Sequence, residues 1–282
     1  MRITGRTRLI ALLGHPVSHT RSPQMQNPAL QRAGMDAVYV PFSVKPENLK
    51  EAVKGLRALD FLGANVTLPH KEAVLPLLDE LSAESKLIGA VNTIVNRNGR
   101  LVGTTTDSPG ILLTLKKAGV NPRKRAITLL GTGGSARTAL FTFLQQGCRD
   151  IALAGRSPEK GGSMVRRAMA HCKIKVPLLK LDSPDFAKRM RETDLLVNCT
   201  SVGMWPGIHE TPVAKKHLHR RMVIFDIVYN PLKTRLIEEG EKIGARTVSG
   251  MDMLVFQGME SFRLWTGKQP AFGAFKRSAL SS

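Results

Sequence analysis

The chain has 282 residues, of which 42% are hydrophobic and 23% charged, values that are ordinary for a globular protein long enough to form two domains. Its 42 Lys and Arg residues outnumber its 22 Asp and Glu residues, which gives a net charge of +20. The basic residues are scattered and aromatic residues make up only 5% of the chain, so the composition favours anionic small molecules as partners and disfavours nucleic acid.

The cysteines and the N-terminal segment bear on the cellular compartment of the protein. Cys148, Cys172 and Cys199 are odd in number and lack the spacing of metal ligands, which favours a reducing environment and gives no sign of a metal site. The apolar run at 9–13 is too short for a signal-peptide core, and the sequence has no apolar stretch of about 18 residues that could span a membrane. We predict a cytoplasmic protein, monomeric or homodimeric.

The first hundred residues alternate between apolar strand-like runs and helical patterns. Strands are predicted at 8–13, 38–42 and 63–68, and helices at 25–33, 49–59 and 71–78. Residues 90–95 and 101–103 should form a hairpin, because the Asn98-Gly99 pair between them suits a tight turn. This alternation predicts a mainly parallel α/β sheet.

A glycine-rich turn opens a second unit after a predicted helix at 109–118. The buried-strand run 126–130 is followed by the sequence GTGGSA, then by a helix at 136–146 and a strand at 151–154. Such a strand–turn–helix–strand order is the context of a dinucleotide site, although a merely structural turn is the alternative. Further strands are predicted at 176–179, 195–198 and 223–227, and a late helix at 254–264. The candidate cofactor residues of the turn are Gly131, Thr132, Gly133, Gly134, Ser135 and Ala136.

The end of the second strand of this unit indicates which dinucleotide is bound. An NAD site usually carries an acidic side chain there, whereas this chain has Gly155 followed by Arg156, Ser157 and Lys160. Two cations and a hydroxyl suit the 2′-phosphate of NADP, with which the arginine can form two parallel hydrogen bonds. NADP is therefore the favoured cofactor, with NAD possible.

The segment NVTLPHK at 65–71 carries a candidate catalytic lysine. Pro69 ends the preceding strand, so Lys71 stands where a helix should begin and can lean into a pocket. Asn65 and Thr67 project from one face of the strand. Together these side chains would form a cradle for a polyhydroxylated acid; the alternative is a surface lysine at the start of an amphipathic helix.

Several further motifs occur in a fixed order along the chain. They are HTRSP at 19–23, AVNT at 90–93, TTTD at 104–107, NCTSVGM at 198–204, DIVYNP at 226–231 and GMDMLVFQG at 250–258. With the lysine segment and the glycine turn, they resemble the shikimate/quinate dehydrogenase family over residues 14–267. The resemblance implies NADP-linked oxidoreduction between shikimate and 3-dehydroshikimate, between quinate and 3-dehydroquinate, or both.

The resemblance implies that Lys71 and Asp107 form the catalytic pair. Oxidation of a secondary alcohol needs a group that takes the hydroxyl proton as hydride leaves, and in reverse a protonated lysine stabilises the developing alkoxide. We assign the pair jointly, because either residue could transfer the proton. Without the family, Asp107 would be interpreted as a helix N-cap before Pro109.

The resemblance also implies the binding residues, position by position. Thr20 and Ser22 would hold the substrate carboxylate, with Tyr39 either closing that end or lying simply in the core. Thr67, Asn92 and Asp107 would bind the substrate hydroxyls. Tyr229 and Gln257 would contact the substrate from the other side of the cleft, and Ile227 and Gly250 would line the nicotinamide pocket.

The chain departs from the family pattern at a few positions. Thr20 stands where a serine is usual, Thr105 and Ser108 where asparagine and glycine are typical, and Ser261 where glutamine is frequent. These departures keep two alternatives open: a paralogue that oxidises another hydroxylated ring acid, and a catalytically idle dinucleotide-binding sensor. The expected architecture is an N-terminal, mainly parallel α/β substrate domain at 1–108, completed by 250–282, and a doubly wound Rossmann-type domain at 109–249.

Overall fold

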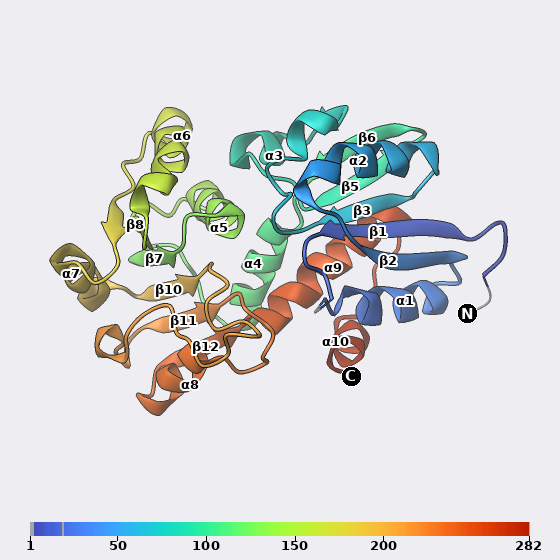
Figure 1. The fold of residues 1–282 in the computed structure, drawn as a ribbon. Coiled ribbons are helices and arrows are strands. Elements are labelled where there is room, and N and C mark those ends of the chain that lie inside the picture. The colour runs from blue at the N-terminus through green and yellow to red at the C-terminus, as the bar shows by residue number, and fades with distance from the viewer. Residues whose placement is uncertain (1–2, 19, 282) are drawn as a thin grey trace. The chain divides into compact units, whose positions relative to one another are not determined.

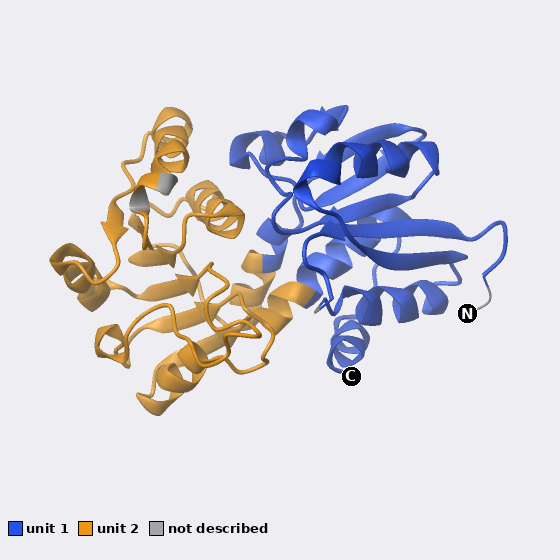
Figure 2. Cartoon of the chain, viewed as in Figure 1, with its two compact units in different colours: residues 1–110, 255–282 blue, residues 111–254 orange. Residues whose placement is uncertain are grey.

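The computed structural model describes residues 3–18 and 20–281, apart from the side chains of Pro158 and Lys160. The chain divides into two compact units (Figure 2): a first unit of Met1–Gly110 with Val255–Ser282, and a second unit of Ile111–Leu254. The boundaries fall inside helices α4 (Asp107–Lys117) and α9 (Gly250–Thr266). Within the described ranges, none of the helices has both the length and the apolar character needed to cross a bilayer.

A six-stranded mixed sheet forms the centre of the first unit (Figure 1). Its strand order is β2-β1-β3-β5-β6-β4, in which β5 runs antiparallel to both neighbours and the other pairings are parallel. The strands are β1 (Arg8–Gly14), β2 (Ala37–Ser43), β3 (Gly63–Val66), β4 (Glu80–Leu81), β5 (Thr93–Arg97) and β6 (Arg100–Thr104). The α/β class predicted from the sequence is confirmed.

Helices cover both faces of this sheet, as a largely parallel sheet requires (Figure 1). They are α1 (Ser22–Arg32), α2 (Leu49–Ala58), α3 (Ala83–Ile88), α9 and α10 (Phe272–Leu280), with short 3₁₀ turns η1 (Pro46–Asn48) and η2 (Leu75–Leu77). Alternation along β3 divides its side chains: Ala64 and Val66 join an apolar cluster with Leu56 of α2, whereas Asn65 faces α9. One face of β3 is thus apolar core, and the other carries polar groups.

The predicted hairpin is present between β5 and β6. Asn98 has φ +53° and Gly99 has φ +85°, the pair of positive values that a type I′ turn needs. Strand β6 ends at Thr104, directly before the segment that leads into α4. The hairpin therefore places the last residue of β6, Thr104, opposite the first residue of β5, Thr93.

The helix predicted at 71–78 is wrong. The segment forms turns that end in η2, because Pro76 has no N–H to donate to the carbonyl of Glu72 and a helix cannot continue through it. A helix that the sequence analysis had not identified, α3, follows instead. Its start and end carry ordinary signals: Ser82 accepts a hydrogen bond from the Ser85 amide, and Gly89 closes the helix with φ +74°. Lys71 consequently lies in a turn.

The second unit is a fully parallel sheet with the strand order β12-β11-β10-β7-β8-β9. The strands are β7 (Ile127–Leu130), β8 (Ile151–Gly155), β9 (Leu178–Lys180), β10 (Leu195–Asn198), β11 (Val223–Asp226) and β12 (Arg246–Ser249). Counted from β7, this order is 6-5-4-1-2-3, the doubly wound Rossmann arrangement, with its switch point between β7 and β10. The predicted Rossmann-type unit is confirmed.

The helices of the second unit are α5 (Gly134–Gln145), α6 (Gly162–Cys172), α7 (Pro184–Glu192) and α8 (Arg235–Lys242), with 3₁₀ turns η3 (Pro158–Gly161) and η4 (Lys215–His217). Sequence analysis identified α5 but missed α6, α7 and α8; most residues of α7 and α8 are charged. Two of the missed helices carry start signals, since Ser183 caps α7 before Pro184 and Thr234 caps α8.

Candidate active site

Lys71 and Asp107 form an ion pair in the first unit. The Lys71 Nζ lies 2.6 Å from Asp107 Oδ2, and the two side chains are 19% and 9% exposed. The backbone of Lys71 is fixed because its carbonyl accepts from the Val91 amide at 2.8 Å. An ammonium carries three donors, so Lys71 can hydrogen-bond a substrate oxygen while it stays paired with Asp107. The pair combines a charge-assisted bond with access for a ligand.

Asn92 holds the other oxygen of the Asp107 carboxylate. Its Nδ2 donates to Asp107 Oδ1 at 2.8 Å, while its Oδ1 accepts from the backbone N–H of Thr106 at 2.7 Å. Asn92 is 4% exposed. Both carboxylate oxygens of Asp107 thus have a side-chain donor, one from Lys71 and one from Asn92. This arrangement favours a role in the site over the helix-cap alternative.

Three buried hydroxyls lie behind Asn92, and we call Thr93, Thr106 and Ser261 the hydroxyl cluster. Their oxygens are mutually within hydrogen-bond distance: Thr93–Ser261 and Thr106–Ser261 at 3.0 Å, and Thr93–Thr106 at 3.2 Å. Each of the three residues is 0% exposed. Asn65 donates from Nδ2 to Thr93 at 3.1 Å and to Ser261 at 3.0 Å. Strands β3 and β5, the start of α4 and helix α9 therefore meet in one polar core.

Tyr39 belongs to this core, in agreement with the second interpretation of its position. It is 1% exposed, and its hydroxyl donates to Asn65 Oδ1 at 2.8 Å. Its ring packs against Trp265 with centroids 6.0 Å apart. The structure thus gives Tyr39 a bond that orients Asn65, and direct contact with a ligand stays a prediction.

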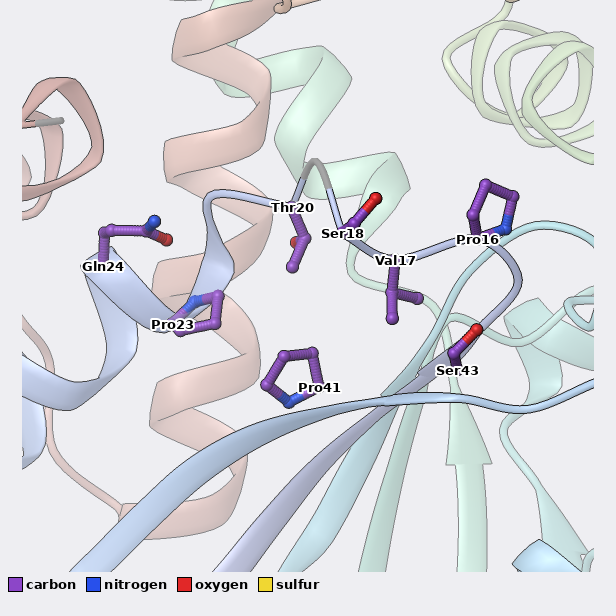
Figure 3. A pocket seen from close by; sticks show the side chains of 8 residues that line it. All are labelled: Pro16, Val17, Ser18, Thr20, Pro23, Gln24, Pro41 and Ser43. Atoms are coloured by element: carbon purple, nitrogen blue, oxygen red, sulfur yellow. The ribbon is translucent and has the colours of Figure 1, made fainter.

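Thr20 and Ser22 bring their hydroxyls together at the start of α1. The Thr20 hydroxyl donates to Ser22 Oγ at 3.3 Å and accepts from the Ser22 amide at 3.3 Å. Beside Thr20 lies a hollow of about 510 Å³ between this loop and the end of β2 (Figure 3). Neither Lys71 nor Asp107 lines it; its lining residues are Pro16, Val17, Ser18, Thr20, Pro23, Gln24, Pro41 and Ser43. His19, in the same motif, lies outside the described residues.

The other predicted substrate residues are half-buried. Thr67 follows β3, and a side chain at Gly14 would lie 2.3 Å from its Cγ2, so the glycine leaves room for the threonine. Gln257 lies on α9 one turn before Ser261, and its carbonyl accepts from the Ser261 hydroxyl at 3.0 Å. Tyr229 belongs to the second unit, in the loop after β11.

The glycine turn has the geometry of a phosphate-binding loop. Gly131 has φ +111°, a conformation that favours glycine, and its N–H donates to the Ala154 carbonyl at 2.7 Å. Gly133 occupies the N-cap of α5, with open space where a side chain would be. Because the glycine at the cap has no side chain that could accept from the first amides of α5, a bound anion can do so. Thr132, Gly134, Ser135 and Ala136 complete the turn, with Ala136 fully buried.

The predicted 2′-phosphate residues follow the neighbouring strand. Strand β8 pairs directly with β7, so the exposed Arg156 and half-buried Ser157 begin at the same edge as the glycine turn. A side chain at Gly155 or Gly161 would lie 3.4 or 3.2 Å from Thr132 Cγ2, which brings this segment against the turn. The side chain of Lys160 lies outside the described part of the chain.

A buried carboxylate shapes the loop that carries Ile227 and Tyr229. Asp226 is 0% exposed and accepts from Asn198 Nδ2 at 2.9 Å, Val228 N at 3.0 Å and the Thr234 hydroxyl at 2.6 Å. Burial raises the pKa of Asp226 to about 6, and hydrogen bonds from these three groups oppose that rise.

Gly250 is fitted against the same loop. A Cβ at this position would lie 2.2 Å from the Ile227 carbonyl oxygen, so the two predicted nicotinamide-pocket residues touch through backbone alone. The residue type is therefore restricted to glycine by contact distance.

Sequence reasoning assigned no role to five residues that the structure brings into these networks. They are Thr93, Thr106, Asn198, Asp226 and Ser261. Thr93 follows Asn92 in the chain and Thr106 precedes Asp107. A polar residue next to a predicted site residue at the end of a strand was the signal that could have identified both threonines. Ser261 was noticed only as a departure from a family pattern.

Comparisons with known proteins agree over the whole chain. The family model of the shikimate dehydrogenase substrate binding domain matches residues 12–94, and that of the shikimate 5′-dehydrogenase C-terminal domain matches residues 250–280. A shikimate dehydrogenase (NADP(+)) of Moorella thermoacetica is 41% identical over 98% of this chain and 94% of its own length.

Solved structures give the same result. A shikimate dehydrogenase in complex with NADP+ superposes with a TM-score of 0.92 at 36% identity, over 99% of this chain and 96% of its own. The Thermus thermophilus enzyme in complex with NADP(H) and shikimate has a TM-score of 0.86 at 34% identity, over 96% and 98% of the two chains. The chain belongs to the shikimate dehydrogenase family.

Proposed function

We propose that this protein catalyses reversible, NADP-linked hydride transfer between shikimate and 3-dehydroshikimate. The observation that carries the proposal is the Lys71–Asp107 ion pair, held by Asn92 at 2.8 Å, in a chain 41% identical to a shikimate dehydrogenase. A paired lysine and carboxylate that remain accessible suit proton transfer to and from an alcohol.

The pair handles the proton while the hydride moves. When NADP is bound, its nicotinamide supplies the hydride acceptor or donor. In the oxidative direction Lys71 and Asp107 together take the hydroxyl proton. In the reductive direction the Lys71 ammonium hydrogen-bonds the ketone oxygen and stabilises the negative charge that develops there. Asn92 keeps the Asp107 carboxylate turned toward Lys71 throughout.

The remaining polar residues of the first unit would orient the ring acid. The adjacent hydroxyls of Thr20 and Ser22, at the start of α1, suit the substrate carboxylate, since a helix N-terminus favours an anion. Thr67, Asn92 and Gln257 supply hydroxyl and amide groups for the ring hydroxyls. Buried polar groups that must be paired discriminate strongly against a substrate that lacks a hydroxyl.

The second unit would bind NADP through the glycine turn and Arg156. The uncapped amides at Gly133 suit the pyrophosphate, and the exposed guanidinium of Arg156 suits the 2′-phosphate. We therefore assign the substrate role to residues 1–108 and 250–282 and the nucleotide role to residues 109–249. Ile227, Tyr229 and Gly250 would border the nicotinamide end.

The setting of the enzyme is also proposed. Free thiols at Cys148, Cys172 and Cys199 suit a reducing cytoplasm. We expect a monomer or homodimer whose partner is a small ring acid. The proposed activity requires neither nucleic acid nor a membrane.

The decisive assay follows NADPH formation with shikimate, with quinate and NAD tested in parallel. Lys71→Ala is expected to lower kcat by roughly 10² to 10⁴, the range for loss of a general acid–base group, while NADP binding is retained. Lys50→Ala, which removes an exposed lysine of α2, is the matched control and should keep wild-type turnover. Full activity of Lys71→Ala, or no turnover of any ring acid by a protein that binds NADP, would refute the proposal.

A further inference from the structure

Ser261 occupies the centre of the polar core, although it lies on α9 and outside the ion pair. Its hydroxyl has four partners, each at 3.0 Å: Asn65 Nδ2, Thr93 Oγ1, Thr106 Oγ1 and the Gln257 carbonyl oxygen. The residue is 0% exposed, so water cannot replace these bonds. Because a hydroxyl has one donor and two acceptor sites, Ser261 can accept from Asn65 and a threonine while it donates to a third group.

The cluster controls which way the Asn92 amide faces. Asn92 Oδ1 accepts from the Thr93 hydroxyl at 3.0 Å and from the Thr106 amide at 2.7 Å, and Asn92 Nδ2 donates to Thr106 Oγ1 at 3.0 Å. With its oxygen held on this side, the amide must present Nδ2 to Asp107 Oδ1. The flipped amide would place two oxygens against each other and leave buried donors unpaired.

We propose that Ser261 is a positioning residue for the Lys71–Asp107 pair. Its hydroxyl donates to the Gln257 carbonyl and accepts from Asn65 and from Thr106, which it thereby holds in place. Thr106 and Thr93 fix Asn92, and Asn92 fixes the carboxylate opposite the lysine. The proposal rests on the proposed function, since that function makes the pair the proton-handling group. Ser261 itself touches neither the substrate nor the reacting atoms.

The compactness of Ser261 is part of this role. Its four partners already lie at 3.0 Å around a fully buried atom, so a longer polar side chain at 261 would displace Asn65 or Thr106. The serine in place of the glutamine frequent in the family therefore belongs to this arrangement of the core.

Ser261→Ala is the first test, with Ser85→Ala as its matched control. Ser85 is also 0% exposed in the first unit, but among the described residues its hydroxyl has no hydrogen-bond partner. Ser261→Ala is expected to lower kcat about ten- to a hundredfold with KM for shikimate changed less than about threefold, because a slightly misplaced catalytic group costs rate. Ser85→Ala should leave kcat at the wild-type value.

Two further variants separate positioning from general destabilisation. Ser261→Thr keeps a hydroxyl that can bond the Gln257 carbonyl and should restore most of kcat. Should its extra methyl group prevent folding, Thr93→Val removes the neighbouring hydroxyl at nearly constant volume and should lower kcat as Ser261→Ala does. Wild-type kcat in folded Ser261→Ala or in folded Thr93→Val would overturn the proposal, whatever their melting temperatures.

Labelling of Lys71 with an amine-reactive reagent, quantified by mass spectrometry, provides a readout that needs no turnover. A loosened Asp107 leaves the Lys71 amine less shielded, so Lys71 should react several-fold faster in Ser261→Ala than in wild type or Ser85→Ala. An unchanged labelling rate overturns the positioning role. Absence of wild-type turnover would instead overturn the proposed function, and the labelling result would still decide the role of Ser261.

Discussion

Replacing the buried Asp226 with asparagine should remove a pH-dependent part of the stability of the second unit. The pKa of Asp226 rises from 3.8 to about 6 on folding, chiefly through burial. Since one pKa unit corresponds to about 1.36 kcal/mol, the ionised carboxylate costs the folded state about 3 kcal/mol at neutral pH. The raised folded-state value means that the native protein binds the proton more tightly than the unfolded chain. This contribution therefore improves as the pH falls from about 6 to about 4.

Asp226→Asn keeps an oxygen for Asn198 and Val228 but does not titrate. The difference in unfolding free energy between wild type and Asp226→Asn should change by between about 2 and 3 kcal/mol from pH ~7 to pH ~4, with wild type gaining at the acidic end. Urea-dependent amide hydrogen exchange in β10 and β11 reports on the second unit alone. Asp185→Asn, at an exposed position of α7, makes the same charge change without burial and should show no such trend.

A difference between wild type and Asp226→Asn that stays constant with pH would refute the reasoning, and so would a difference that grows in the opposite direction. The first outcome would mean that Asp226 titrates normally in the native state. The second would mean that the hydrogen bonds from Asn198, Val228 and Thr234 outweigh burial.

Two more substitutions probe the second unit and the glycine contacts. Arg156→Ala should weaken NADP binding about ten- to a hundredfold in a fluorescence titration and leave NAD binding unchanged. The control Arg191→Ala, at an exposed position, should affect the binding of neither dinucleotide. Equal losses of affinity for both dinucleotides in Arg156→Ala would contradict a 2′-phosphate role. Gly250→Ala forces a Cβ to within 2.2 Å of the Ile227 carbonyl and should lower stability by about 1–3 kcal/mol in thermal unfolding. Gly55→Ala, in open space on α2, should instead gain about 0.5–1 kcal/mol, and similar effects of the two changes would show that the contact at 250 is relaxed.

Periodicity and glycine chemistry predicted the central strands and the cofactor turn well. Strands β7 and β8 are short, fully buried apolar runs, and Gly131 lies between β7 and α5 as its positive φ requires. The predicted helix at 71–78 failed because apolar spacing was given more weight than Pro76. Helices α7 and α8 were missed because most of their residues are charged, and packing of a narrow apolar face stabilises them.

Side-chain convergence was predictable only in part. The pairing of Lys71 with Asp107 was expected from a family resemblance, since no local pattern relates residues 36 positions apart. Asn65 was expected to face a ligand, and the structure places it against α9 instead, bonded to Ser261. Which element covers the polar face of β3 is decided by tertiary packing, and no sequence period reports it.

The hydroxyl cluster also constrains how this protein can change over generations. Thr93, Thr106 and Ser261 satisfy one another in a volume closed to water, so an apolar replacement at one of them strands donors or acceptors on the other two. Such a step is disadvantageous alone and tolerable only with a compensating change. We expect each of these three positions to accept only polar replacements unless its partners change with it.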